Sequence, residues 1–161
     1  MDEGKKQAFD KLIKLIDQYY LSAMKNSTGP HDLLLAIVDE MDETKRFGTV
    51  PSLPIVNEVI NYLRIKLLSN DTSTVTRTII LLDVLVKNCQ FRIHYYVGKK
   101  KFMKTFSKVT RYYLKNKINE KNNQVGDFAK DVIQHWAQAF YPRRNLYPYI
   151  CDTYVKLKVS H

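Results

Sequence analysis

Apolar residues recur at intervals of three and four along nearly the whole chain, which is the spacing of one face of an α-helix. Near the N-terminus, Phe9, Leu12 and Ile16 fall on one such face. Read in this way, the 161 residues contain eight expected helices, at about 5–25, 31–43, 52–67, 74–88, 91–97, 99–117, 125–140 and 146–157. The first is expected to end before residues 26–30, where Gly29-Pro30 is the stop signal, and residues 119–124 are expected to form a polar linker.

Five Gly and five Pro in the whole chain leave little material for the many turns of an all-β protein. The fourth expected helix is apolar on nearly every side, which predicts the central and most buried position. Residues 34, 35, 38 and 41 are expected to face inward on the second helix, as are 146, 150, 153, 154 and 157 on the eighth. These features predict an all-α fold, a single domain over residues 1–161 built as a right-handed superhelix of about eight helices, in the α-solenoid class.

The formal net charge of +10 comes from one segment. Residues 84–119 contain no Asp or Glu but ten Lys and Arg, whereas the rest of the chain carries 16 basic and 16 acidic residues. Such a one-signed field attracts inositol lipids, acidic peptides or nucleic acid.

Five of these cations follow the helical repeat at i, i+3, i+7, i+10 and i+14, and so should share one face of the sixth helix; they are Lys101, Lys104, Lys108, Arg111 and Lys115. Each cation near an anionic membrane gains about 1 kcal/mol, so these five with Lys99 and Lys100 would give a reversible attraction. The alternative interpretation is a solvated charged face without a ligand.

Catalysis and cofactors are not expected. No phosphate-binding glycine loop, nucleophile elbow or paired metal-ligand spacing occurs among the four histidines and two cysteines. A Cys89–His94 thiol–base pair can be imagined, but Cys89 lies in an apolar pattern. The first residues lack a secretory apolar core, and no stretch approaches the roughly 20 apolar residues of a membrane span, so we expect a cytoplasmic protein with reduced thiols.

One run of residues resembles a known family. LDVLVKNCQFRIHYYVG at 82–98, followed by KFM at 101–103, resembles helices four to six of VHS domains, with VKNC at 86–89 as the most specific part. WAQAF at 136–140 and DTY at 152–154 are similar to the last two helices of that family. The resemblance implies an eight-helix superhelix of the ENTH/VHS type, peripheral on endosomal or Golgi membranes, that serves as an adaptor in vesicular protein sorting.

The resemblance also implies two binding sites. Many VHS domains bind ubiquitin weakly through a Trp and a Leu on helix two, and those positions are His31 and Leu35 here. Because the Trp is replaced, a large apolar anchor is lost. In the alternative interpretation, His31 is a polar first-turn residue and Leu35 belongs to the core.

The second implied site lies between helices six and eight, where Golgi-localised members bind acidic dileucine peptides. Lys99, Lys101 and Lys108 resemble the positions that face the peptide acid, and Ile150 and Tyr154 resemble the groove wall. Two further lysines, at 104 and 156, depart from the uncharged residues expected there, which puts the leucine pocket in doubt.

The sequence therefore predicts a sorting adaptor domain whose partners are an anionic, phosphoinositide-bearing membrane surface, acidic sorting peptides, or ubiquitin. Nucleic acid is not an expected partner. The alternative is a nuclear superhelical domain that binds the phosphorylated C-terminal tail of RNA polymerase II. Trp136, Asn88 and Cys89 are interpreted as structural.

Overall fold

The structure is a computed structural model that describes residues 3–22, 28–42 and 53–160. These residues form eight α-helices and one short 3-10 helix. The α-helices are α1 (Glu3–Leu21), α2 (Thr28–Met41), α3 (Leu53–Lys66), α4 (Thr72–Asn88), α5 (Phe91–Val97), α6 (Lys100–Lys115), α7 (Glu120–Phe140) and α8 (Pro148–Ser160), and the 3-10 helix η1 (Tyr141–Arg143) follows α7.

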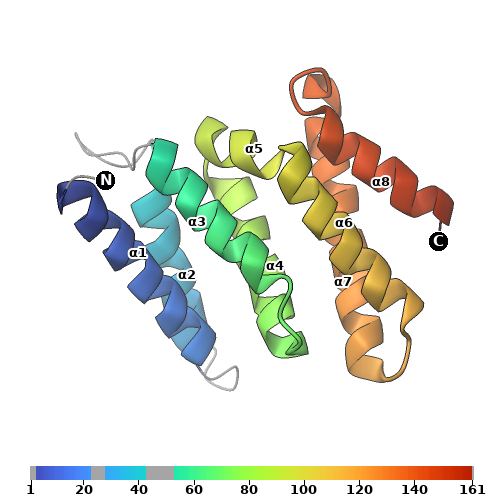
Figure 1. The fold of residues 1–161 in the computed structure, drawn as a ribbon, viewed down its shortest axis with the longest axis horizontal. Helices are drawn as coiled ribbons and strands as arrows, with labels where there is room; N and C mark the ends of the chain where they lie inside the picture. The colour runs from blue at the N-terminus through green and yellow to red at the C-terminus, as the bar shows by residue number, and fades with distance from the viewer. Residues whose placement is uncertain (1–2, 23–27, 43–52, 161) are drawn as a thin grey trace.

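The long helices pack in two rows. Helices α1, α3, α6 and α8 follow one another in the front row of Figure 1, and α2, α4 and α7 lie behind them. Each helix packs against its neighbours in its own row and against one or two helices of the other row. The expected single all-α superhelix is therefore confirmed.

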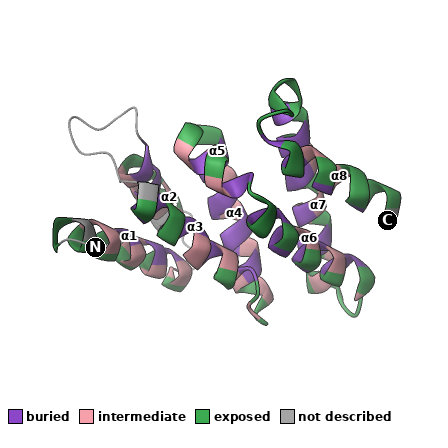
Figure 2. Cartoon of the chain, turned by 45° about the horizontal axis from the view of Figure 1, so that its top comes forward, coloured by how far each residue is buried: buried purple, intermediate pink, exposed green. Residues whose placement is uncertain are grey.

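A single apolar cluster fills the space between the rows, and buried residues lie where helices face one another (Figure 2). The expected central helix α4 is confirmed, since Ile79, Leu82 and Leu85 have no exposed surface. Trp136 is only 2 % exposed, and its ring centroid lies 5.5 Å from that of Phe106. Its Nε1–H donates to the Asp83 carboxylate at 2.9 Å. Its predicted structural role is confirmed.

Local capping explains where several helices begin and end. Asp71 caps α4 by accepting the backbone N–H of Thr74 at 3.2 Å, which satisfies a first-turn donor. At the other end of α4, Asn88 donates to the carbonyl of Val84 at 2.8 Å and Cys89 is buried. The predicted structural role of both residues is therefore confirmed.

Three expected boundaries are wrong. Gly29 and Pro30 lie inside the first turn of α2, where a proline needs no N–H partner. The expected linker 119–124 is mostly helix, because Asn119 caps α7 by accepting the N–H of Asn122 at 2.9 Å. Leu146 precedes α8 and is 72 % exposed rather than facing inward. The region 23–27 at the expected end of the first helix lies outside the described residues.

Candidate functional site

Helix α6 is the most strongly two-sided helix of the fold. One side is buried against α7, α3 and α8 through Phe102, Met103, Phe106, Val109, Tyr113 and Leu114. The opposite side carries the cations: Lys100, Lys101, Lys104, Lys108 and Lys115 are exposed, and Arg111 is half-buried. The buried side anchors the helix, so the cations are held in fixed order along the surface.

Five of these cations line a groove of about 710 Å³ between α6 and α8, which we call the α6–α8 groove. The α6 wall supplies Lys100, Lys104, Lys108, Arg111 and Lys115 together with Met103, Ser107, Tyr112 and Asn116, and the α8 wall supplies Tyr149, Asp152, Thr153 and Lys156. The expected basic face therefore exists in the fold as one wall of a groove.

Positive charge dominates the α6–α8 groove. Asp152 is the one acid among its lining residues, and its carboxylate pairs with Lys156 at 3.0 Å on the same helix. The Nε of Arg111 is buried and has no hydrogen-bond partner within the described residues. The groove thus offers ammonium and guanidinium donors to an acidic ligand, and little of this charge is cancelled locally.

Lys99 and Lys101 lie away from this groove. They line a hollow of about 190 Å³ on the α3 side of α6, beside Asn61 and Arg64. The ammonium of Lys99 also lies 4.6 Å from the centroid of the Tyr95 ring. Since each helical residue turns about 100°, Lys101 stands at the edge of the cationic arc. The seven expected cations are therefore divided between two hollows.

The expected groove wall is not found where the resemblance implied it. Ile150 has no exposed surface, and Tyr154 is half-buried against the core. The residues of α8 that line the groove are 149, 152, 153 and 156, which follow the i, i+3, i+4, i+7 repeat. Ile150 is out of phase with that repeat, so it packs inward.

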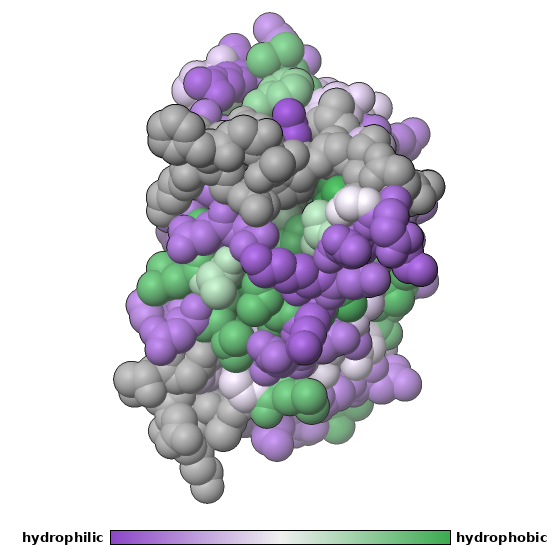
Figure 3. Space-filling view, turned by 90° about the vertical axis from the view of Figure 1, so that its left-hand side faces the viewer, coloured by the Kyte–Doolittle hydropathy of each residue, from purple (hydrophilic) through white to green (hydrophobic). Residues whose placement is uncertain are grey.

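Helix α2 exposes part of the implied ubiquitin site. His31 is exposed and Leu35 is 50 % exposed, so the expectation that Leu35 faces the core is wrong. Leu33 and Leu34 are half-buried beside it. Viewed from the side of α1 and α2, the surface has apolar areas between polar ones (Figure 3). An apolar contact centred on Leu35 is therefore accessible to a partner.

The imagined thiol–base pair has a different arrangement. His94 Nε2 lies 2.9 Å from the carbonyl oxygen of Val86, and its ring packs edge-on against Phe140 with centroids 4.8 Å apart. Cys89 is 3 % exposed and belongs to the core cluster. Burial raises the pKa of the other thiol, Cys151, against a smaller opposing effect of Arg144. Neither thiol is placed as an activated nucleophile.

Sequence reasoning missed the uncharged groove residues, chiefly Tyr112 and Tyr149. Tyr112 is 53 % exposed and stands beside Lys108 on α6. The sequence does indicate that Tyr112 lies beside the cations, because it follows Lys108 by four residues and precedes Lys115 by three on the same helix. Nothing in the sequence alone indicates that α8 presents Tyr149 to the same groove.

Three comparisons bear on the fold. A family model described as the VHS domain matches residues 32–161. The structure is also similar to the crystal structure of the VHS and FYVE tandem domains of Hrs, described as a protein involved in membrane trafficking and signal transduction, with a TM-score of 0.67 and 21 % identity. The similarity covers 94 % of this chain and 60 % of that one. Among curated proteins no match was found.

Proposed function

The chain belongs to the VHS domain family, and on this basis we propose that it is a non-catalytic adaptor domain in vesicular protein sorting that binds anionic membrane lipid through the α6–α8 groove. The observation that carries the proposal is the row of cations along α6, five of which line one groove that holds a single acid. Such an array attracts a phosphoinositide-bearing membrane by charge and releases it as salt rises. We propose a cytoplasmic location, peripheral on endosomal or Golgi membranes.

Several features support membrane attachment by surface contact. Among the described helices, none is both long and apolar enough to cross a bilayer. VHS domains typically serve as adaptors in membrane trafficking, and the similar Hrs protein is described as acting in that process. The cations are spread over one helix rather than gathered in a deep cavity, which suits a broad anionic surface better than one small anion.

The test is co-sedimentation with neutral vesicles and with vesicles that contain phosphoinositide. The variant Lys108→Glu/Lys115→Glu reverses two groove cations, and Lys6→Glu/Lys14→Glu reverses two exposed cations on α1 with the same change in net charge. At about 1 kcal/mol per lysine, the groove variant should bind at least roughly thirtyfold more weakly. The α1 variant should bind nearly as well as the native chain. Equal losses in both variants would contradict a role for the groove.

An acidic sorting peptide is a second candidate ligand of the same groove. The groove residues Tyr112 and Tyr149 are 53 % and 40 % exposed and offer apolar surface beside the cations, as a peptide with both acidic and apolar side chains requires. Titration calorimetry with an acidic dileucine peptide should show binding that Lys104→Glu/Lys108→Glu abolishes. A phosphorylated polymerase-tail peptide belongs in the same titration, because tighter binding of that peptide would favour the alternative nuclear function.

Ubiquitin is a candidate ligand of α2. The half-exposed Leu35 and the exposed His31 support it, and the small apolar area they offer predicts weak binding. NMR titration with ubiquitin should shift amide signals of α2, and Leu35→Ser should remove the shifts. Unchanged spectra at millimolar ubiquitin would remove this candidate.

A further inference from the structure

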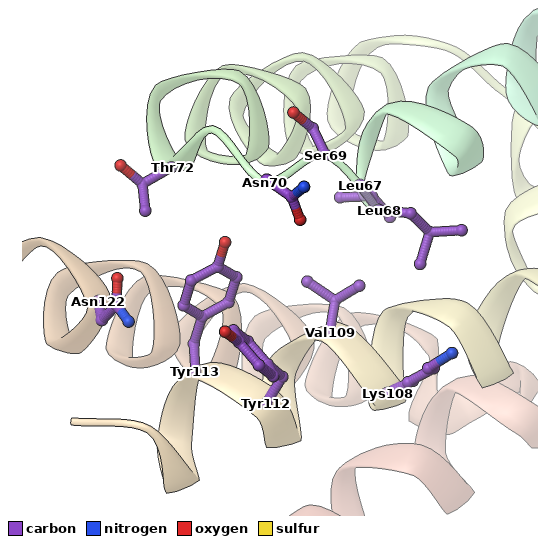
Figure 4. A pocket seen from close by; sticks show the side chains of 10 residues that line it. All are labelled: Leu67, Leu68, Ser69, Asn70, Thr72, Lys108, Val109, Tyr112, Tyr113 and Asn122. Atoms are coloured by element: carbon purple, nitrogen blue, oxygen red, sulfur yellow. The ribbon is translucent and has the colours of Figure 1, made fainter. Parts of the chain in front are cut away.

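A third hollow, of about 620 Å³, lies between α6 and the turn that joins α3 to α4. Tyr112 and Tyr113 reach from α6 toward this turn, which carries Leu68 and Asn70 (Figure 4). Lys108 and Tyr112 line both this hollow and the α6–α8 groove. The cationic side of α6 is therefore continuous with the α3–α4 turn.

The end of the molecule around this hollow exposes large apolar side chains. Leu68 is 47 %, Tyr112 53 % and Ile118 76 % exposed. They come from the α3–α4 turn, the last turn of α6 and the loop between α6 and α7, and all three segments lie along the lower side of Figure 1. We call residues 67–71 and 112–119 together the turn edge. Leu68 and Tyr112 line the hollow, and Ile118 is exposed on the loop that follows α6. Single exposed apolar residues are common, but here they recur along one edge of the molecule.

The charges around the turn edge are mainly positive. Lys108, Lys115, Lys117 and Lys121 are exposed there, and the acids are Asp71 and Glu120. The Asp71 carboxylate is already bonded to the backbone and hydroxyl of Thr74. Apolar side chains surrounded by lysines are the arrangement by which peripheral proteins enter the interface of an anionic bilayer.

From this arrangement we infer that the turn edge enters the headgroup region of an anionic bilayer, so that the domain stands on the membrane through the C-terminal ends of α3 and α6. This inference rests on the proposed membrane function and adds an orientation to it. Helix α6 runs obliquely from the upper half of Figure 1 down to the turn edge. The fifteen residue steps from Lys100 to Lys115 have a helical rise of about 22 Å. Since charge is screened within about 8–10 Å, Lys115 acts on the membrane and Lys100 does not.

This orientation differs from one in which α6 lies flat on the membrane, where Lys100 and Lys115 would contribute equally. It also leaves the upper part of the α6–α8 groove, near Lys100 and Tyr149, open to a peptide while the domain is on the membrane. One copy could then hold lipid and peptide together.

The test combines depth and charge measurements on the full chain with vesicles that contain phosphoinositide. Trp136 is the single tryptophan and is buried, so Ile118→Trp adds a reporter whose fluorescence brominated lipids quench if it enters the bilayer. Leu146→Trp is the matched control, because Leu146 is 72 % exposed at another end of the molecule. We expect strong quenching for Ile118→Trp, and none for the control or the native chain.

Two pairs of variants complete the test. Leu68→Ser/Ile118→Ser should weaken vesicle binding at least about tenfold, whereas Leu146→Ser/Val159→Ser should not. Lys115→Glu should weaken binding several-fold more than Lys100→Glu. The orientation is overturned, and the proposed function stands, if the native protein binds anionic vesicles but Ile118→Trp is not quenched and both lysine variants lose the same amount of vesicle affinity. Absence of vesicle binding would overturn both.

Discussion

Arg77 offers the sharpest test of how the front row of helices is held to the back row. It lies on α4, is 5 % exposed, and donates from its guanidinium to the carbonyls of Tyr19, at 2.6 Å, Tyr20, at 3.0 Å, and Ser22. These carbonyls end α1, where the helix dipole also favours a cation. In return, the Tyr19 hydroxyl donates to the carbonyl of Arg77 at 2.9 Å.

The substitution Arg77→Met keeps most of the apolar stem and removes every donor. Each bond from a charged donor is worth about 1.5–3 kcal/mol, but the three are not additive, and burying the guanidinium has its own cost. Removal of one partner from a buried charged network costs about 3–5 kcal/mol. For a domain with a free energy of unfolding of about 5–15 kcal/mol, that is at least about a fifth of its stability.

Urea unfolding followed by circular dichroism measures this loss. With a slope of roughly 2 kcal/mol per molar urea, the midpoint should fall by about 2 M. Arg143→Met, on the exposed η1 helix, is the control and should change the free energy of unfolding by less than about 0.5 kcal/mol. The loss of unfolding free energy for Arg77→Lys should lie between those of the two methionine variants, because a lysine ammonium reaches fewer carbonyls than the planar guanidinium of arginine. A loss below about 1 kcal/mol for Arg77→Met would show that these hydrogen bonds do not hold α1 to α4.

Three further substitutions test other contacts by urea unfolding. Gly126→Ala places a Cβ 3.1 Å from the Tyr113 carbonyl carbon of α6, so forcing α7 from α6 should cost about 1–3 kcal/mol; an unchanged midpoint would contradict the close approach. Asp71→Ala should cost about 1 kcal/mol at pH 7. Hydrogen bonds within the cap, first that from the Thr74 side chain, hold the pKa of the Asp71 carboxyl below its usual value. The ionised carboxylate therefore stabilises the fold above about pH 4, and this stabilisation is lost as pH falls through the folded-state pKa. The cost of Asp71→Ala should be smaller at pH 3 than at pH 7, and an equal cost at both pH values would contradict this. Trp136→Phe removes the bond to Asp83 and should cost about 1–3 kcal/mol; a neutral result would show that the bond contributes nothing.

Helical periodicity predicted the eight helices and the buried centre because apolar stripes require a facing layer. The boundaries at Gly29-Pro30 and at residues 119–124 were wrong for a shared reason. Proline and polar residues at the start of a helix resemble a loop in sequence, whereas in the fold they form a first turn. Only the cap geometry, such as the Asn119 bond to Asn122, separates the two cases.

The cations of the site were predictable from the sequence, but their division between the α6–α8 groove and the hollow beside α3 was not. Spacing placed Lys101 and Lys104 on one face, yet Lys101 lines the hollow beside α3 and Lys104 lines the α6–α8 groove. Which hollow a residue joins depends on the neighbouring helices, and the sequence of α6 does not contain that information. For the same reason, the burial of Ile150 and the exposure of Tyr149 followed from how α8 packs.

The most direct test of the account is NMR mapping of backbone amides with nanodiscs, comparing neutral lipid with lipid that contains phosphoinositide. If α6 is the membrane-binding element, anionic discs should perturb the amides of residues 104–119 and leave those of α2 and the middle of α4 unchanged. Perturbations confined to α2, or identical spectra with neutral and anionic discs, would contradict the central claim.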